Sequence, residues 1–168
     1  MPQLVKRTEI IAYLNTGEKG AGTKTWSLVG NKTTDLSYSY NPQETTEQYV
    51  VDDVASTTLD GYQLAIDGEM KCYFGDAVYD YINGLRYNLS IGDSAVTEVL
   101  LIDKYDKNSS DSSFKAQTFE CTVSVNSYGG AGGETPTISY TIGINGNPTQ
   151  GSVTFTGKTP TFTPTVSA

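Results

Sequence analysis

The sequence predicts a mainly β domain with a single helix packed on or between its sheets. Segments such as 114–126 and 137–145 alternate apolar and polar residues at a period of two, which is typical of half-buried strands. Only residues 76–85 place apolar side chains at helical spacing. Strands separated by turn residues, together with one short helix, indicate a sheet fold covered by that helix.

The helix has its own start signal. Asp76 follows Gly75 and is expected to cap the helix, because its carboxylate can accept a backbone N–H of the first turn. Gly84 is either the residue just past the helix end or an interior glycine. The apolar residues that follow the cap at helical spacing form the predicted core face of the helix: Val78, Tyr81, Ile82 and Leu85.

A hairpin is predicted immediately before the helix. Residues 61–66 alternate in polarity, and Asp67-Gly68 is a favourable pair for a two-residue turn because both positions tolerate a positive φ. The return strand is expected to run from Glu69 to about Phe74.

Residues 1–25 are expected to form a flexible N-terminal arm. The segment Thr16–Gly22 is rich in turn residues, and Trp26 opens the ordered domain, which is predicted to span 26–156. The first strand of that domain is expected over 35–41.

The connection 42–60 is long for a hairpin loop, and such loops are usually functional or disordered. An apolar, β-prone triplet lies inside it and is followed by two acids. These side chains either fold back onto their own sheet or pack on another copy of the protein. They are the candidate subunit-interface residues of the chain: Tyr49, Val50, Val51, Asp52 and Asp53.

Further strands are predicted after the helix. Residues 96–105 are apolar on both faces, which indicates a central strand, and 114–126 is the longest alternating segment. The strand at 137–145 is expected to turn at Asn145–Pro148 into a strand at 150–156. The Thr- and Pro-rich residues 157–168 are expected to form an extended C-terminal tail.

Charge and composition exclude several classes of protein. The 168 residues carry 19 acids and 11 bases, a net charge of −8, so a surface that grips nucleic-acid phosphates is not expected. The outward faces of the strands are rich in Ser and Thr, which suits a wet surface that does not hold phosphates. No apolar run has the length of a membrane span and no secretory signal is visible, so membrane insertion of this chain is not expected.

Catalytic, metal and cofactor sites are also not expected. The chain has no histidine, the commonest general base and metal ligand, and Cys72 and Cys121 lie in strand patterns typical of buried thiols. The segment GEKGAGTKT at 17–25 lacks the glycine–lysine step of a phosphate-binding loop. The glycine run 129–133 precedes a strand and no helix. The acids of 103–111 lack the glycine and terminal glutamate of a calcium loop.

Taken together and in order, several motifs between residues 26 and 164 resemble the major tail tube proteins of long, non-contractile-tailed bacteriophages, within the tail-tube and secretion-tube superfamily. The motifs are Trp26, LSYSYNPQ at 36–43, LDGY at 59–62, GDAVYDYI at 75–82, INGNP at 144–148, GSV at 151–153 and FTP at 162–164.

The resemblance implies a β-sandwich with one short flanking helix. It implies hexameric rings in which the subunit sheets join into a barrel, and ring stacking into a tube through which DNA passes without specific binding. It also implies assembly in the host cytoplasm, a final place in the virion tail, and contacts with tail-tip or initiator, tape-measure and tail terminator proteins.

Two other functions are open from the residues alone. Twelve tyrosines and hydroxyl-rich strand faces also fit a carbohydrate- or receptor-binding β-sandwich. A glycan hydrolase that uses two carboxylates is a third possibility, because such enzymes need no histidine.

Overall fold

The computed structural model describes residues 2–108 and 111–165 of the chain. Over these residues an eight-stranded antiparallel sheet has the strand order β2-β1-β7-β8-β9-β6-β3, with β10 paired to β9, and β4 and β5 form a separate two-stranded ribbon. The elements are η1 (Arg7–Glu9), β1 (Ile10–Asn15), β2 (Trp26–Val29), β3 (Thr33–Ser39), β4 (Pro42–Glu47), β5 (Ser56–Tyr62), β6 (Ala65–Lys71), α1 (Ala77–Asn88), η2 (Gly92–Ala95), β7 (Val96–Lys107), β8 (Phe114–Gly129), β9 (Thr137–Thr156) and β10 (Thr159–Pro164).

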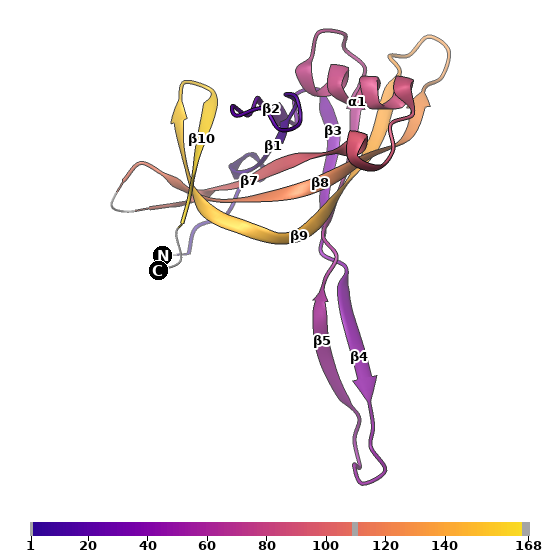
Figure 1. Cartoon of the computed structure of the whole chain (residues 1–168), viewed down its shortest axis with the longest axis vertical. Coiled ribbons are helices and arrows are strands. Elements are labelled where there is room, and N and C mark those ends of the chain that lie inside the picture. Colours follow the sequence, from indigo (N-terminus) through magenta and orange to yellow (C-terminus); the bar gives the residue numbers. More distant parts are fainter. Residues whose placement is uncertain (1, 109–110, 166–168) are drawn as a thin grey trace.

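The large sheet curls around α1 (Figure 1). Val29 of β2, at one end of the strand order, and Met70 of β6, near the other, belong to the same buried cluster as Ile82 of the helix. One continuous curled sheet therefore supplies both sides of the core. The prediction of a mainly β fold with one flanking helix is confirmed.

α1 begins directly after its predicted cap residue, Asp76. Asp76 Oδ1 accepts hydrogen bonds from the backbone N–H groups of Val78 and Tyr79, both at 3.1 Å. The helix continues through Gly84, which is therefore an interior residue, and ends at Asn88 with Leu89 in the left-handed conformation. Val78 and Ile82 are buried, Tyr81 and Leu85 are partly buried against the same cluster, and Tyr79 is a further buried residue.

The prediction of a flexible N-terminal arm over 1–25 is corrected, because residues 10–15 form strand β1 of the large sheet. Ala12 and Leu14 are fully buried, and β1 lies between β2 and β7 in the sheet. Thr97 Oγ1 donates to the Asn15 carbonyl at 2.7 Å, which fixes the end of this strand. The partner strand β7 follows about 90 residues later, so the pairing leaves no local sequence signal. Of the predicted arm, Met1 lies outside the described residues.

The Asp67-Gly68 turn is also corrected, because β6 runs straight through it. Asp67 pairs with Thr141 of β9 and Gly68 pairs with Tyr140. A Cβ at residue 68 would lie 2.6 Å from Tyr140 Cζ, so this glycine makes room for a buried ring. The reason for the glycine is a distant aromatic side chain and not a reversal of the chain.

Two further predictions are corrected near the C-terminal end, one of a turn and one of an extended tail. β9 continues past Asn145–Pro148, where Thr118 of β8 pairs with Thr149 and Glu120 pairs with Asn145, so the extra residues form a bulge. Residues 159–164, predicted as part of an extended tail, pair with β9 as β10. Residues 166–168 of that tail lie outside the described part of the chain.

The central position predicted for 96–105 agrees with the structure. β7 lies between β1 and β8, and its side chains enter two clusters, with Val99 on the helix side and Leu100 on the other. The second cluster is partly covered by aromatic residues of β8 and β9 and by Phe162 of β10. Buried residues on both faces explain why this strand reads as a continuous apolar run.

Cys121 is fully buried, Cys72 is partly buried, and both are free thiols. Burial raises the pKa of the Cys121 thiol to about 12, so this group is a protonated core residue.

Candidate functional site

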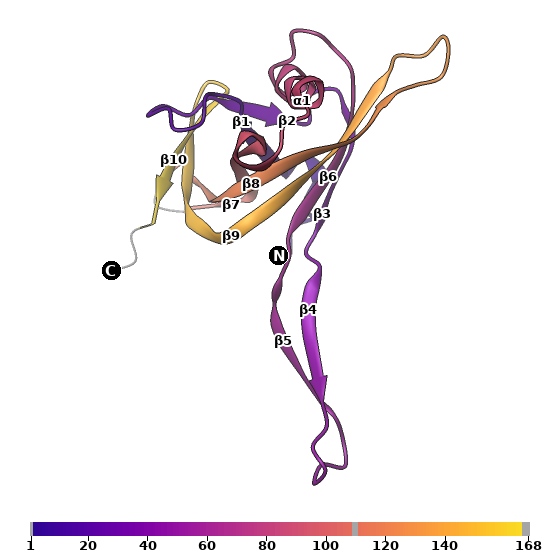
Figure 2. The same ribbon diagram turned by 45° about the vertical axis from the view of Figure 1, so that its right-hand side comes forward.

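A two-stranded arm projects from the body of the protein. β4 and β5 pair from Pro42–Tyr62 to Glu47–Ser56, and Figures 1 and 2 both show this ribbon pointing away from the sheet and α1. We refer to residues 42–62 as the arm. The predicted loop over 42–60 is thus corrected to a hairpin whose strands are polar and exposed along nearly their whole length.

Hydrogen bonds hold the base of the arm in a fixed direction. Gln63 N–H donates to the carbonyls of Tyr40 and Asn41 at 3.1 and 3.2 Å, and Asn41 Nδ2 donates to the Gln63 carbonyl at 3.1 Å. The rings of Tyr40 and Tyr62 meet edge to face with centroids 6.2 Å apart. Along the ribbon, Thr45 donates to Asp60. These contacts favour one orientation of the arm relative to the body.

The tip of the arm is an ordered turn that exposes apolar side chains. Asp52 N–H donates to the Tyr49 carbonyl at 2.9 Å, so Val50 and Val51 occupy the two central positions. Central turn positions normally hold Gly, Pro, Asn or Asp, and valine gains nothing there from local structure. Val50 is fully exposed, Val51 is 91% exposed and Val54 is 77% exposed.

The predicted interface residues 49–53 therefore lie together at the tip, and they do not fold back onto the protein's own sheet. Tyr49 Oη donates to Glu47 Oε2 at 2.7 Å, and this bond raises the pKa of the Tyr49 phenol. The arm contains five acids and no Lys or Arg: Glu44, Glu47, Asp52, Asp53 and Asp60. It is an acidic ribbon with an apolar end.

A second surface is the outer face of β8, β9 and β6, on the side of the sheet away from α1. Its side chains are small and hydrogen-bonded across strands: Thr141 Oγ1 donates to Asp67 Oδ1 at 2.6 Å, and the Ser127 and Ser139 hydroxyls are 2.6 Å apart. We call this the hydroxyl face. Its members are Asp67, Glu69, Glu120, Thr122, Ser124, Ser139 and Thr141.

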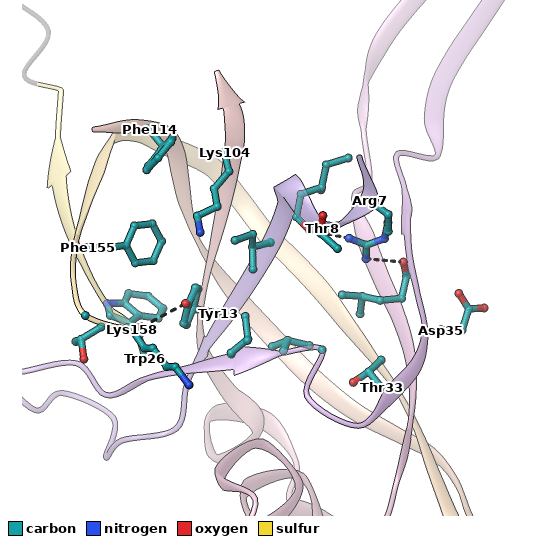
Figure 3. Close-up of a pocket in the computed structure, with 18 of the residues that line it drawn as sticks. Arg7, Thr8, Tyr13, Trp26, Thr33, Asp35, Lys104, Phe114, Phe155 and Lys158 are labelled. Carbon is teal, nitrogen blue, oxygen red and sulfur yellow. Dashed lines mark hydrogen bonds between the residues drawn. The ribbon is translucent and has the colours of Figure 1, made fainter. Parts of the chain in front are cut away.

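A third surface is a groove across the outer side of β1 and β2, with a volume of about 1310 Å³ (Figure 3). β3 borders one side of it and the β9–β10 turn borders the other. Aromatic side chains and three cations line it: Tyr13, Trp26, Phe114, Phe155, Arg7, Lys104 and Lys158. Sequence reasoning identified Trp26 as the start of the ordered region and as a motif of the resemblance, but it missed the groove because the aromatic residues come from four separate strands.

Sequence reasoning also missed exposed apolar side chains near the ends of α1. Phe74 precedes the helix, and Tyr87, Leu89 and Ile91 lie at its end, and each is at least four-fifths exposed. The helix was predicted to end near residue 85, so these residues were not placed on a common surface.

The described residues contain no cluster of His, Cys, Asp or Glu that could hold a metal ion. None of the helices that the structure describes is long and apolar enough to cross a membrane.

No protein-family model and no curated protein matches the sequence. Solved structures do match the fold. The SPP1 phage tail tube, determined by solid-state NMR and cryo-EM, aligns with a TM-score of 0.64 over 88% of this chain and 78% of that chain, at 12% identity. The tail of an empty gene transfer agent particle, refined with C6 symmetry, aligns with a TM-score of 0.58 over 92% of this chain and 100% of that chain, at 13% identity. The chain has the tail-tube fold that its motifs predict.

Proposed function

We propose that this chain is a structural subunit that assembles into stacked hexameric rings and forms the tail tube of a phage or related particle. The observation that carries the proposal is the arm, which has an ordered apolar tip and almost no buried surface in the monomer. Ordering a chain segment costs about 1–2 kcal/mol per residue in backbone entropy. An arm held in one direction with exposed valines at its end is understandable if it packs against another copy.

The likeness to the SPP1 tail tube and the gene transfer agent tail supports the same function. In a ring with closed symmetry, each subunit presents the same surfaces to its neighbours, and the edges of the curled sheet can pair between subunits to form a barrel. Among the described strands, β2 and β3 end the main strand order, and β10, which pairs only with β9, is a further edge.

In the proposed tube, the hydroxyl face lines the lumen. Asp67, Glu69 and Glu120 outnumber the one cation that β6 adds to this side, Lys71, and the remaining members of the face are neutral hydroxyls. DNA that moves through the tube would meet few cations to bind its phosphates, so little counterion release would hold it in place. This arrangement supports a role as a conduit for DNA ejection and does not require a specific nucleic-acid site or an enzymatic activity.

The further expectations from the family resemblance belong to the same proposal. The tube is assembled in the host cytoplasm and becomes part of the virion tail, where a tail-tip or initiator complex starts it, a tape-measure protein lies inside it and a terminator protein ends it.

Light scattering of the purified protein over a concentration series tests the proposal. We expect scattering to stay at the monomer level below a threshold and to rise steeply above it, because ring closure and stacking are cooperative. Glycan binding by a chain that stays monomeric, even when tail-tip complexes are added as nuclei, would contradict the proposal and favour a binding module.

A further inference from the structure

The groove between β3 and the β9–β10 turn is the most prominent feature that the proposed function leaves unexplained. Its volume of about 1310 Å³ exceeds the roughly 300–1,000 Å³ of an ordinary small-molecule pocket, and it is open along the surface. These properties favour a polypeptide segment as the occupant.

The walls of the groove combine an aromatic surface with positive charge. The Phe155 ring meets those of Tyr13 and Phe114 with centroids 6.4 and 6.0 Å away. Lys104 Nζ lies 4.8 Å from the centroid of Phe155. Tyr13 Oη donates to the Lys158 carbonyl at 3.4 Å, and this bond connects the β9–β10 turn to β1. Figure 3 shows Phe114, Phe155 and Lys104 gathered at one end of the groove.

The cations of the groove have no carboxylate partner among the residues that the structure describes. Arg7 donates to two backbone carbonyls, those of Ile10 at 2.6 Å and Leu36 at 3.1 Å. No ion pair is formed by Lys104 or Lys158 within the described residues, whose ion pairs involve other lysines. Asp35 also borders the groove, but Figure 3 shows its carboxylate directed away from the aromatic side chains.

The arm has the complementary composition. It carries five acids and no cation, and its tip exposes Tyr49, Val50, Val51 and Val54 beside Asp52 and Asp53. A segment whose apolar residues are flanked by acids complements a groove whose aromatic residues are flanked by cations, in both polarity and charge. In a chain of net charge −8, a groove bordered by three cations is an unusual place, and the acidic arm is its natural counterpart.

The arm cannot reach the groove of its own subunit. Both ribbon views show it leaving the body beside β3 and β6 and pointing away from β1, β2 and β10 (Figures 1 and 2). The hydrogen bonds of Gln63 and Asn41 hold this direction. The occupant therefore has to come from a second copy of the chain.

We infer that the arm tip of one subunit docks in the aromatic and cationic groove of another, with Val50 and Val51 against the Trp26 side of the groove and Asp52 and Asp53 facing Lys104 and Lys158. This inference rests on the proposed tube function and names the surface that receives the arm. Because the contact is made between different copies, it joins subunits in a head-to-tail manner and can propagate along a tube.

A charge exchange in the full-length protein tests the docking. The groove variant Lys104→Glu/Lys158→Glu and the arm variant Asp52→Lys/Asp53→Lys each place like charges together, so each is expected to raise the critical concentration for assembly by about tenfold or more. The variant that carries all four substitutions restores opposite charges and is expected to assemble within about threefold of the wild-type threshold.

The control variant Lys19→Glu/Lys71→Glu makes the same change in net charge outside the groove. It also breaks the exposed ion pair of Lys19 with Asp93, but such pairs contribute little, so the variant is expected to keep the wild-type threshold. All substituted positions are exposed, and thermal unfolding of each monomer checks that the fold is kept. Two results would overturn the docking, provided that the wild type assembles. One is a groove variant with the wild-type threshold. The other is a variant with all four substitutions whose threshold is no lower than that of the weaker-assembling double variant. Failure of the wild type itself to assemble, even with a tail-tip complex as nucleus, would instead overturn the proposed tube function.

Discussion

Val50→Asp is expected to leave the monomer folded and to abolish tube assembly under conditions in which the wild-type protein polymerises. The Val50 side chain is fully exposed, so the substitution removes no packing within the subunit. Its effect on the free energy of unfolding should stay within about 0.5 kcal/mol, as for other surface substitutions. At an apolar contact between subunits, by contrast, the new carboxylate would be desolvated without a partner.

The expected effect on assembly is large because the charge environment of the tip adds to the desolvation cost. Asp52 and Asp53 already stand beside Val50, so a third carboxylate also adds repulsion. A cost of about 3 kcal/mol per contact raises the critical concentration by about a hundredfold. Sedimentation of assembled material over a concentration series measures this shift.

Val50→Thr is the matched control, since it keeps a β-branched side chain of nearly the same shape and adds no charge. We expect it to assemble at a concentration within about tenfold of the wild-type threshold. Tubes of normal length formed by Val50→Asp at the wild-type threshold would show that the tip is not buried between subunits.

Gly68→Ala is expected to cause a large loss of stability, because it adds a methyl group where the sheet core has no space for one. The new Cβ would lie 2.6 Å from both Cζ and the hydroxyl oxygen of Tyr140. Tyr140 is fully buried in the helix-side cluster, so its ring can move away only by displacing packed neighbours. Overpacking of this kind costs about 3 kcal/mol, which for a domain of this size lowers the melting temperature by about 6–12 °C.

Gly61→Ala provides the comparison, because a Cβ at that position meets no atom within 4 Å and its φ is not positive. Its melting temperature should lie within about 2 °C of the wild-type value. Replacing Tyr140 with Phe in the Gly68→Ala background removes the hydroxyl that the new methyl group meets, so part of the lost stability should return. Equal melting temperatures for Gly68→Ala and Gly61→Ala would contradict the packing described for β6 and β9.

Local signals in the sequence predict the helix and its cap, but not the residue at which it ends. Asp76 caps α1 through bonds to the next turn, and the apolar residues of the helix follow at a spacing that is visible within twelve residues of sequence. The end at Asn88 depends on Leu89, whose left-handed conformation is costly for a leucine and has no sequence signature.

Errors in the predicted strands share one cause, which is that distant residues decide the conformation. Asp67-Gly68 has the composition of a turn, yet the glycine is needed because it leaves space for the ring of Tyr140, more than 70 positions later. Asn145–Pro148 also has the composition of a turn and forms a bulge, where the proline needs no ladder hydrogen bond. β1 pairs with β7 across a similar separation, so its position in the sheet could not be predicted locally.

The candidate site shows the same division between local and distant information. The apolar triplet Tyr49–Val51 is contiguous and stands out in a polar segment, so the sequence identifies it as a candidate interface beside the alternative that it folds back onto its own sheet. The groove is assembled from β1, β2, β3, β7, β8 and β9, and its aromatic residues are each ordinary strand residues when considered alone. Only the curled sheet brings them together.

Negative-stain electron microscopy of the purified protein over a concentration series tests the central proposal most directly. We predict hollow tubes of uniform diameter built from stacked rings with six-fold symmetry at concentrations above the scattering threshold, and single subunits below it. Particles that remain single subunits at every concentration, with or without a tail-tip complex as nucleus, or that form only solid irregular fibrils, would contradict the assignment of this chain as a tube subunit.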